Sequence, residues 1–287
     1  MPAVIFAVHF GEYYCVGSGV PVFRSSGVLN TRVPRFCLSL TERMYGDRLV
    51  RVLVPFGYRE TRRQPYPLLV LHDGQNLFEQ GSTAPGGGSW RVDLVVDRLI
   101  AARRIPPIVV AGIDHAGIDR INEFTPTAAG KSGAGGAAEY GRLVVATVLP
   151  RLAKDYHVSV NADGMGLGGS SMGGLVTLWM AAMFPGRFGR LMVMSPSLWW
   201  DRRVVLRHLR KHPLDPQPRI WLDAGRKEGA TVTRDARELH RLLRRQDRAS
   251  VKYVEDPRGD HSEASWGRRL PDALEWLWGT DESIGNG

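Results

Sequence analysis

The chain has 287 residues, of which 43% are hydrophobic and 23% are charged, and this composition excludes a disordered or fibrous protein. The length is sufficient for a single α/β unit with a large buried core. The net charge of +9 raises nucleic acid as a partner, but most of the 38 basic residues are arginines spread over the whole length, which argues against a binding patch.

Along the chain, apolar runs rich in β-branched residues alternate with segments of helical period. Strands are predicted over residues 49–55, 66–72, 108–113, 165–169, 190–195, 219–224 and 251–255. Helices are predicted over 91–103, 138–156, 172–184, 202–211, 232–246 and 265–278. This alternation predicts a mainly parallel central sheet with helices on both faces. No break in composition divides the series, so we expect an N-terminal extension (1–40), one domain (41–278) and a flexible tail (279–287).

A candidate nucleophile follows the fourth predicted strand, where residues 169–173 read Gly-Ser-Ser-Met-Gly and open a helical pattern. This is the G-x-S-x-G pattern in which a serine occupies a sharp turn between a strand and a helix, and the glycines avoid collisions with the neighbouring chain. Ser171 is the predicted nucleophile, and the N–H of Met172 at the helix start is a predicted oxyanion donor. The alternative is a glycine-rich turn without chemistry; no lysine follows, as a phosphate-binding loop would require.

A nucleophilic serine needs a base, and in such hydrolases the chain order is serine, acid, histidine. His261 follows the last predicted strand, in a loop rich in turn residues that precedes the last predicted helix. His208, His212 and His240 fit less well, because they lie among arginines on predicted helices. His261 is therefore the predicted base, with an ordinary surface histidine as the alternative.

The acid is expected in the loop after the penultimate predicted strand. Glu228 lies beyond that strand and is free to turn toward His261, whereas Asp223 lies within the strand and is committed to one face of the sheet. Asp256 and Asp260 are also near the histidine in sequence. Because the acid has only to orient the imidazole and stabilise its charged form, several positions are suitable, and Glu228 is the preferred one.

Five segments together resemble the putative-esterase family of α/β-hydrolases, which includes enterochelin esterases, feruloyl esterases and S-formylglutathione hydrolases. They are LHDGQNLF (71–78), GSSMGG (169–174), SPSLWW (195–200), GRKE (225–228) and the segment from His261 to Trp266. The resemblance extends from about Val50 to Trp278. It implies an α/β-hydrolase fold, and no segment between the predicted strands is long enough to form a large cap domain.

The resemblance also implies roles for single residues. Ser171 corresponds to the nucleophile, His261 to the base and Glu228 to the acid, although the family often has aspartate at the last position. Asp73 and Gln75 lie in a loop that takes the place of the HGGG loop of lipases, with Asp73 beside the substrate and the N–H of Gln75 as the second oxyanion donor. The glycine between them allows close approach of the backbone, and an ordinary turn is the alternative.

Two further segments are candidates for substrate binding. Arg120 follows the third predicted strand and is suited to an anionic substrate group, or else to an ion pair with Glu123 that fixes its loop. Trp199 and Trp200 follow another strand at the same edge of the sheet, where they either form the wall of a pocket or pack in the core.

The expected function is hydrolysis of a small-molecule carboxylic ester through an acyl-enzyme, without a metal or organic cofactor. The first alternative is an acyltransferase with the same triad. The second is a non-enzymatic basic protein that binds nucleic acid through the arginine-rich segments 202–211 and 234–248, which are interpreted instead as solvated helix faces.

The N-terminal segment and the cysteines indicate the compartment. No basic residue precedes the apolar stretch 3–8, as a signal peptide would require, and no apolar run is long enough for a membrane span. Cys15 and Cys37 cannot form a disulfide framework and lack metal-ligand spacing. We therefore expect a cytoplasmic protein without a membrane or specific nucleic-acid partner, and the sequence does not predict its oligomeric state.

Overall fold

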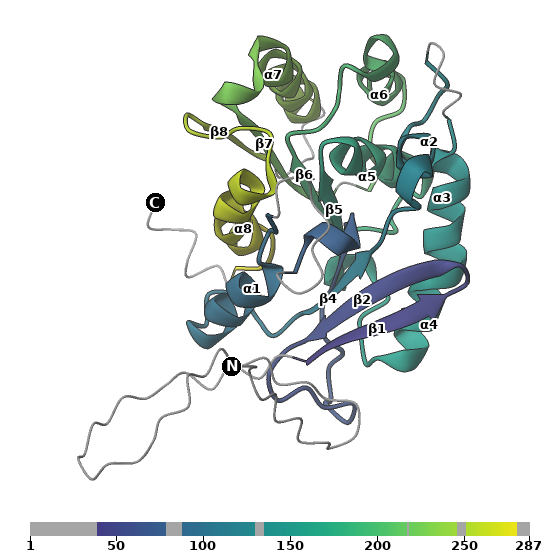
Figure 1. The fold of residues 1–287 in the computed structure, drawn as a ribbon, viewed down its shortest axis with the longest axis vertical. Coiled ribbons are helices and arrows are strands. Elements are labelled where there is room, and N and C mark those ends of the chain that lie inside the picture. Colours follow the sequence, from purple (N-terminus) through teal and green to yellow (C-terminus); the bar gives the residue numbers. More distant parts are fainter. Residues whose placement is uncertain (1–38, 79–87, 130–134, 217, 246–250, 280–287) are drawn as a thin grey trace, which may run out of the picture.

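The computed structural model describes residues 39–78, 88–129, 135–216, 218–245 and 251–279 (Figure 1). Both cysteines, most of the expected N-terminal extension and all but the first residue of the expected tail lie outside the described residues. Within these ranges, no helix combines the length and the apolar character needed to cross a membrane.

The described chain contains one sheet of eight strands, in the order β1-β2-β4-β3-β5-β6-β7-β8. β1 pairs antiparallel with β2, and β2 pairs antiparallel with β4, whereas all other neighbours are parallel. The strands are β1 (Ser39–Tyr45), β2 (Arg48–Val54), β3 (Leu68–His72), β4 (Val109–Ile113), β5 (Met165–Ser170), β6 (Arg190–Met194), β7 (Arg219–Gly225) and β8 (Val251–Asp256). The predicted mainly parallel sheet is confirmed.

Helices cover both faces of this sheet (Figure 1). α1 and α8 pack in one hydrophobic core and α3 to α7 in the other. The α-helices are α1 (Val92–Ala101), α2 (Arg120–Phe124), α3 (Ala137–Leu143), α4 (Leu149–Asp155), α5 (Met172–Met183), α6 (Trp200–Lys211), α7 (Ala230–Arg245) and α8 (Glu263–Trp278). Short 3-10 turns are η1 (Gly74–Asn76), η2 (Gly117–Asp119), η4 (Ala162–Gly164) and η5 (Arg226–Glu228), and η3 (Val144–Val148) is a π-helical turn.

The central strand β3 shows why the two cores form. Every residue of this strand is buried. Leu68 and Val70 belong to the core under α3 to α7, whereas Leu69 and Leu71 belong to the core under α1 and α8. Because successive side chains of a strand point to opposite faces, a continuous apolar run supplies both cores at once.

The structure differs from the predicted elements in β1, in the helix predicted over 138–156 and in α2, which lies where a loop was predicted. Strand β1 was not predicted, because its exposed edge carries polar residues such as Glu42, which pairs with Arg51 of β2 at 2.6 Å. The helix predicted over 138–156 is instead three segments, α3, η3 and α4, since a π-helical turn interrupts the regular backbone pattern.

Candidate active site

The candidate nucleophile lies at the turn between β5 and α5. Ser171 has φ 56° and ψ −120°, a strained conformation for a residue with a side chain. A Cβ atom added to Gly169 would lie 3.0 Å from the carbonyl carbon of Gly173, so the two glycines of the G-x-S-x-G pattern permit the tight turn. The N–H of Ser171 donates to the carbonyl of Met194 in β6 at 3.0 Å, which anchors the turn to the sheet.

The side chains of Ser171, His261 and Glu228 form a continuous hydrogen-bonded chain. His261 Nε2 lies 2.9 Å from Ser171 Oγ, and His261 Nδ1 lies 2.6 Å from Glu228 Oε2. An ionised carboxylate is only an acceptor, so Nδ1 carries the ring proton and the neutral Nε2 is left to accept the hydroxyl proton of the serine. The three predicted residues are therefore brought together in the predicted order.

The loop that carries His261 connects β8 to α8 and is fixed by its neighbours. The carboxylate of Asp260 accepts hydrogen bonds from Ser262 Oγ at 2.5 Å and from Ser265 Oγ, and Ser262 caps α8. The ring of Trp266 meets the imidazole edge-on at a centroid distance of 5.0 Å. Asp260 therefore ties the loop to the start of α8, and its hydrogen bonds go to Ser262 and Ser265, not to the imidazole.

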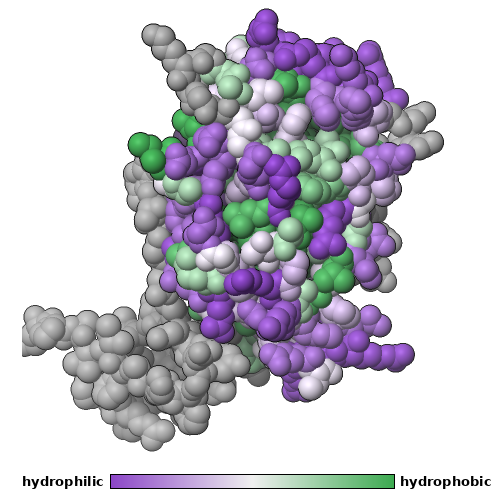
Figure 2. Space-filling model, turned by 90° about the vertical axis from the view of Figure 1, so that its right-hand side faces the viewer, coloured by the Kyte–Doolittle hydropathy of each residue, from purple (hydrophilic) through white to green (hydrophobic). Residues whose placement is uncertain are grey.

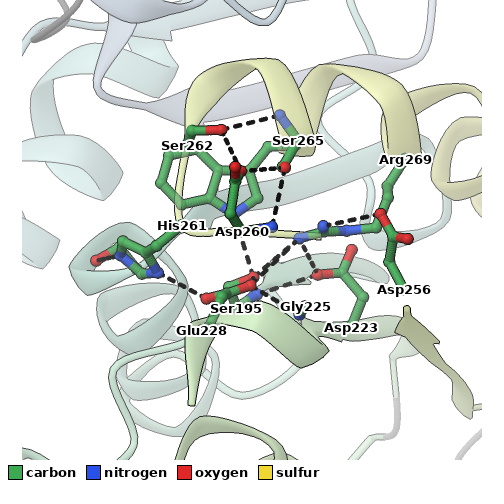
Figure 3. A network of polar contacts seen from close by, with 12 residues as sticks. Ser195, Asp223, Gly225, Glu228, Asp256, Asp260, His261, Ser262, Ser265 and Arg269 are labelled. Carbon is green, nitrogen blue, oxygen red and sulfur yellow. Dashed lines mark hydrogen bonds and ion pairs between the residues drawn. The ribbon is translucent and has the colours of Figure 1, made fainter. Parts of the chain in front are cut away.

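Glu228 lies at the end of η5, directly after β7. Its side chain is fully buried, whereas that of His261 is 45% exposed. While Oε2 faces the histidine, Oε1 accepts hydrogen bonds from Ser195 Oγ at 2.6 Å and from the N–H of Gly225 at 2.7 Å (Figure 3). Both oxygens of this buried carboxylate are thus satisfied, as a charged group without solvent requires.

The other two candidate acids have different partners. Asp223 lies in β7, as expected, and binds Arg269 at 3.0 Å and the indole N–H of Trp221 at 2.8 Å. Burial raises the pKa of Asp223, and the contact with Arg269 opposes this effect. Asp256 accepts a hydrogen bond from the N–H of Arg258 at 2.9 Å and faces Arg269.

The loop after β3 borders the serine turn. Asp73 has φ 60° and begins the 3-10 turn η1, which contains Gln75. A Cβ added to Gly74 would lie 2.6 Å from backbone atoms of Gly112, so only glycine fits where this loop crosses β4. A Cβ added to Gly173 would lie 3.3 Å from Asp73 Oδ2, which places the loop beside α5. Met172 is the first residue of α5, and the first N–H groups of a helix have no partner within the helix.

Arg120 fixes the same loop. Its Nε and Nη2 donate to the two carboxylate oxygens of Asp73 at 2.6 and 2.8 Å. The alternative ion pair of Arg120 with Glu123 is wrong, because Glu123 binds Arg48 of β2 through both of its oxygens. A bidentate pair of this kind fixes both position and orientation, so Arg120 holds Asp73 at the start of η1.

The two adjacent tryptophans differ in their surroundings. Trp200 is buried in the core, and its indole N–H donates to the carbonyl of Thr127 at 3.0 Å, so the expected role in a pocket wall does not fit this residue. Trp199 remains 49% exposed. Ser197, just before them, lies with its Oγ 3.3 Å from Ser171 Oγ.

The arginines of α6 and α7 make ion pairs in addition to contacting solvent. Arg203 and Arg210 of α6 bind Glu238 of α7, and Arg237 of α7 binds Glu255 of β8. Part of the positive charge of these helices is therefore neutralised within the protein. Hydrophilic residues dominate the upper part of the face in Figure 2, toward α6.

Within the described ranges, no group of three or more His, Cys, Asp and Glu is arranged to hold a metal ion.

Sequence reasoning did not identify Ser195, Ser197 and Arg269 as site residues. Ser195 and Ser197 lie in the SPSLWW segment, which carries part of the family resemblance but from which only the two tryptophans were predicted as site residues. Arg269 gives no local signal, because it is one of many arginines and lies 46 positions from Asp223.

The fold is that of the α/β-hydrolases. A profile of the Esterase family, described as "Putative esterase", matches residues 41–277. The chain therefore belongs to this family of carboxylic ester hydrolases.

The relatives include both an uncharacterized protein and named esterases. YbbA, an uncharacterized protein of Bacillus subtilis, is 22% identical over 263 residues, which cover 85% of this chain and 98% of YbbA. The iron(III) salmochelin esterase of Escherichia coli O6:H1 is 31% identical over 234 residues, 75% of this chain and 51% of that protein. The crystal structure of the enterobactin esterase from Shigella flexneri in the presence of enterobactin matches with a TM-score of 0.68 and 25% identity, over 86% of this chain and 60% of that chain. The chain thus spans about half of the first esterase and three fifths of the second.

Proposed function

We propose that this protein hydrolyses a small-molecule carboxylic ester through an acyl-enzyme, with Ser171 as nucleophile, His261 as general base and Glu228 as the acid of the triad. The observation that carries the proposal is the pair of hydrogen bonds that join His261 Nδ1 to Glu228 and His261 Nε2 to Ser171, at 2.6 and 2.9 Å. These two distances are within the range needed for proton transfer.

In the first half-reaction, Ser171 Oγ bonds to the ester carbonyl carbon while its proton passes to His261 Nε2. The carbonyl oxygen takes up the electron pair, and the N–H groups of Gln75 and Met172 stabilise it. When the carbonyl re-forms, the alcohol leaves with the proton from His261. Water then repeats these steps on the acyl-enzyme, which releases the acid and restores Ser171.

Glu228 supports this cycle without taking the proton. Its carboxylate orients the imidazole and stabilises the imidazolium that forms when Ser171 attacks. The full burial of its side chain strengthens this electrostatic effect, because little solvent screens the charge.

The names of the relatives suggest the first substrates to test. Two relatives are named as esterases of iron(III) salmochelin and of enterobactin, so we propose to assay cyclic triscatecholate esters beside feruloyl, acetyl-sugar and p-nitrophenyl esters. Trp199, which is exposed and lies two positions after Ser197, is the residue we propose to contact an aromatic substrate group.

The proposal is tested by covalent labelling together with turnover. A fluorophosphonate should modify Ser171 in a single stoichiometric adduct, mapped by peptide mass spectrometry, and the same reagent should abolish ester hydrolysis. Labelling at another residue, or full turnover after labelling, contradicts the proposal. An added alcohol that diverts the acyl group from water would assign acyl transfer instead.

A further inference from the structure

The hydroxyl of Ser195 has one free direction, and it points at Glu228. Ser195 Oγ accepts hydrogen bonds from the indole N–H of Trp266 at 3.1 Å and from Arg269 Nη2 at 2.9 Å. A serine hydroxyl has two acceptor lone pairs and one proton. Since both lone pairs are occupied, the proton is directed to the remaining neighbour, Glu228 Oε1, at 2.6 Å (Figure 3).

We propose that Ser195 and Arg269 are positioning residues that hold Glu228 as a carboxylate with one oxygen fixed toward His261. This inference rests on the proposed function, because it assigns the residues that support the acid of the triad. Neither residue touches the proposed nucleophile.

The backbone of Ser195 supports a dedicated role. Its φ of 42° lies in the left-handed region, which is unfavourable for a residue with a side chain. The Ser195 N–H donates to both the carbonyl and the side-chain Oδ1 of Asp223, each at 3.1 Å. The neighbouring strand β7 thus holds Ser195 in the conformation that places its hydroxyl beside Glu228.

Arg269 supplies the charge that this buried site needs. Its guanidinium, on α8, lies 3.0 Å from Asp223, 3.8 Å from Glu228 and 3.6 Å from Asp256. Asp223 and Glu228 are fully buried, whereas Asp256 is partly exposed and also faces Arg268. Two buried carboxylates beside one buried cation leave one negative charge, and protonation of His261 during the reaction cancels it. Arg269 therefore offsets part of the cost of burying these two carboxylates.

The first experiment deletes the hydroxyl alone. Ser195→Ala should lower kcat by roughly 10-fold to 100-fold, the effect of one hydrogen bond to a charged group, while KM changes by less than about twofold. Thr233→Ala, which deletes a buried hydroxyl at the start of α7 outside this network, is the matched control and should leave both constants near the wild-type values. A merely structural role would instead lower the fraction of folded protein at unchanged kcat.

The second experiment follows the titration of His261 by NMR and therefore does not depend on a known substrate. Without the Arg269 cation, the cluster binds a proton more readily, so Arg269→Met should move the His261 titration to higher pH by roughly one pH unit. The macroscopic titration moves in the same direction whether the proton resides on His261 or on Glu228. Arg269→Lys should restore most of the wild-type titration, and Arg237→Met, which removes an exposed cation, should not move it.

The outcomes separate this inference from the proposed function. A kcat of Ser195→Ala within threefold of wild type, or an unmoved titration in folded Arg269→Met, overturns the positioning role even if Ser171 proves essential. If the protein hydrolyses no ester, the proposed function fails, and the NMR comparison still decides whether Arg269 controls the His261 titration. If Arg269→Met does not fold, the positioning role is tested with Ser195→Ala alone. The two measurements are then the kcat of this variant and the chemical shift of the low-field Nδ1 proton of His261.

Discussion

Gly225 and Gly259 lie in direct contact where the loops after β7 and β8 meet. A Cβ added to Gly225 would lie 2.4 Å from the carbonyl oxygen of Gly259 and 2.6 Å from Glu228 Oε1. The N–H of Lys227 donates to the same carbonyl at 2.9 Å. Because neither glycine has a side chain, the loop that carries Glu228 can lie against the loop that carries His261.

This contact predicts a large effect of a single methyl group. Gly225→Ala should separate the two loops and lower kcat/KM by roughly 100-fold, since a displacement of about 1 Å at catalytic groups has effects of that size. Gly88→Ala is the matched control, because its added Cβ would meet Glu263 at an ordinary 3.6 Å. Steady-state kinetics of both variants provide the measurement, and near-wild-type activity of Gly225→Ala would show that the loops tolerate separation.

The second prediction concerns the two adjacent serines of the turn. Ser171→Ala should lower ester turnover by roughly 10⁴-fold or more with the circular dichroism spectrum unchanged, because it removes the atom that bonds to the substrate. Ser170→Ala should have a far smaller effect, since the Ser170 side chain is buried at the end of β5. Equal losses in the two variants would remove Ser171 as the nucleophile.

Much of the fold was predictable because the central strands are buried on both faces. The continuous apolar runs of β3 and β4 have the composition of parallel strands between two helix layers. By contrast, β1 lies at the edge of the sheet, and polar and apolar residues do not alternate regularly along it. Its pairing with β2 is a hairpin closed by Gly46 and Asp47, a two-residue turn signal that the strand prediction did not use.

In the candidate site, too, some residues were predictable from local sequence and others were not. Ser171 and His261 were predictable because each lies at a loop defined by local turn residues and by chain order. Arg269 was not predictable, because its role depends on the approach of α8 to β7, and its i±4 neighbours give no sign of this contact. The pairing of Arg120 with Asp73 likewise joins two loops that are 47 positions apart.

The third prediction identifies the acid of the triad. Glu228→Gln should lower kcat by roughly 10⁴-fold, as the loss of the corresponding carboxylate does in serine proteases, with little change in KM, because an amide no longer fixes the tautomer of His261 or stabilises its charge. Asp256→Asn is the matched control and should be mild, since Asp256 does not contact the imidazole. Should Asp256→Asn prove the more damaging variant, the assignment of Glu228 fails while the Ser171–His261 pair stands.

The fourth prediction concerns the loop that contains Gln75. Arg120→Met removes both hydrogen bonds to Asp73 and should lower kcat by roughly tenfold, a fraction of the effect of losing an oxyanion donor outright. Arg104→Met removes a half-exposed ion pair with Glu275 and should leave kcat unchanged. If Arg120 instead bound an anionic group of the substrate, KM for anionic esters would rise and kcat would be retained.

The fifth prediction concerns His72, which ends β3 and is fully buried. Burial lowers the pKa of His72 from 6.5 to about 4. Below pH 6.5 the unfolded chain therefore binds a proton that the folded protein does not bind until about pH 4. The free energy of unfolding should fall as the pH drops through this range, by about 3 kcal/mol in total at roughly 1.4 kcal/mol per pH unit.

Urea unfolding at pH 7.0 and pH 4.5 tests this contribution. His72→Asn should be less stable than the wild type at pH 7.0 but should lose less of its stability on acidification, because asparagine does not titrate in this range. Tyr140→Phe removes the hydroxyl that lies 2.8 Å from His72 Nδ1 but leaves the ring buried, so the pH dependence should persist in this control. If the wild type and His72→Asn lose equal stability between the two pH values, the acid sensitivity of the fold has another source, such as the carboxylates that are ion-paired in the native state.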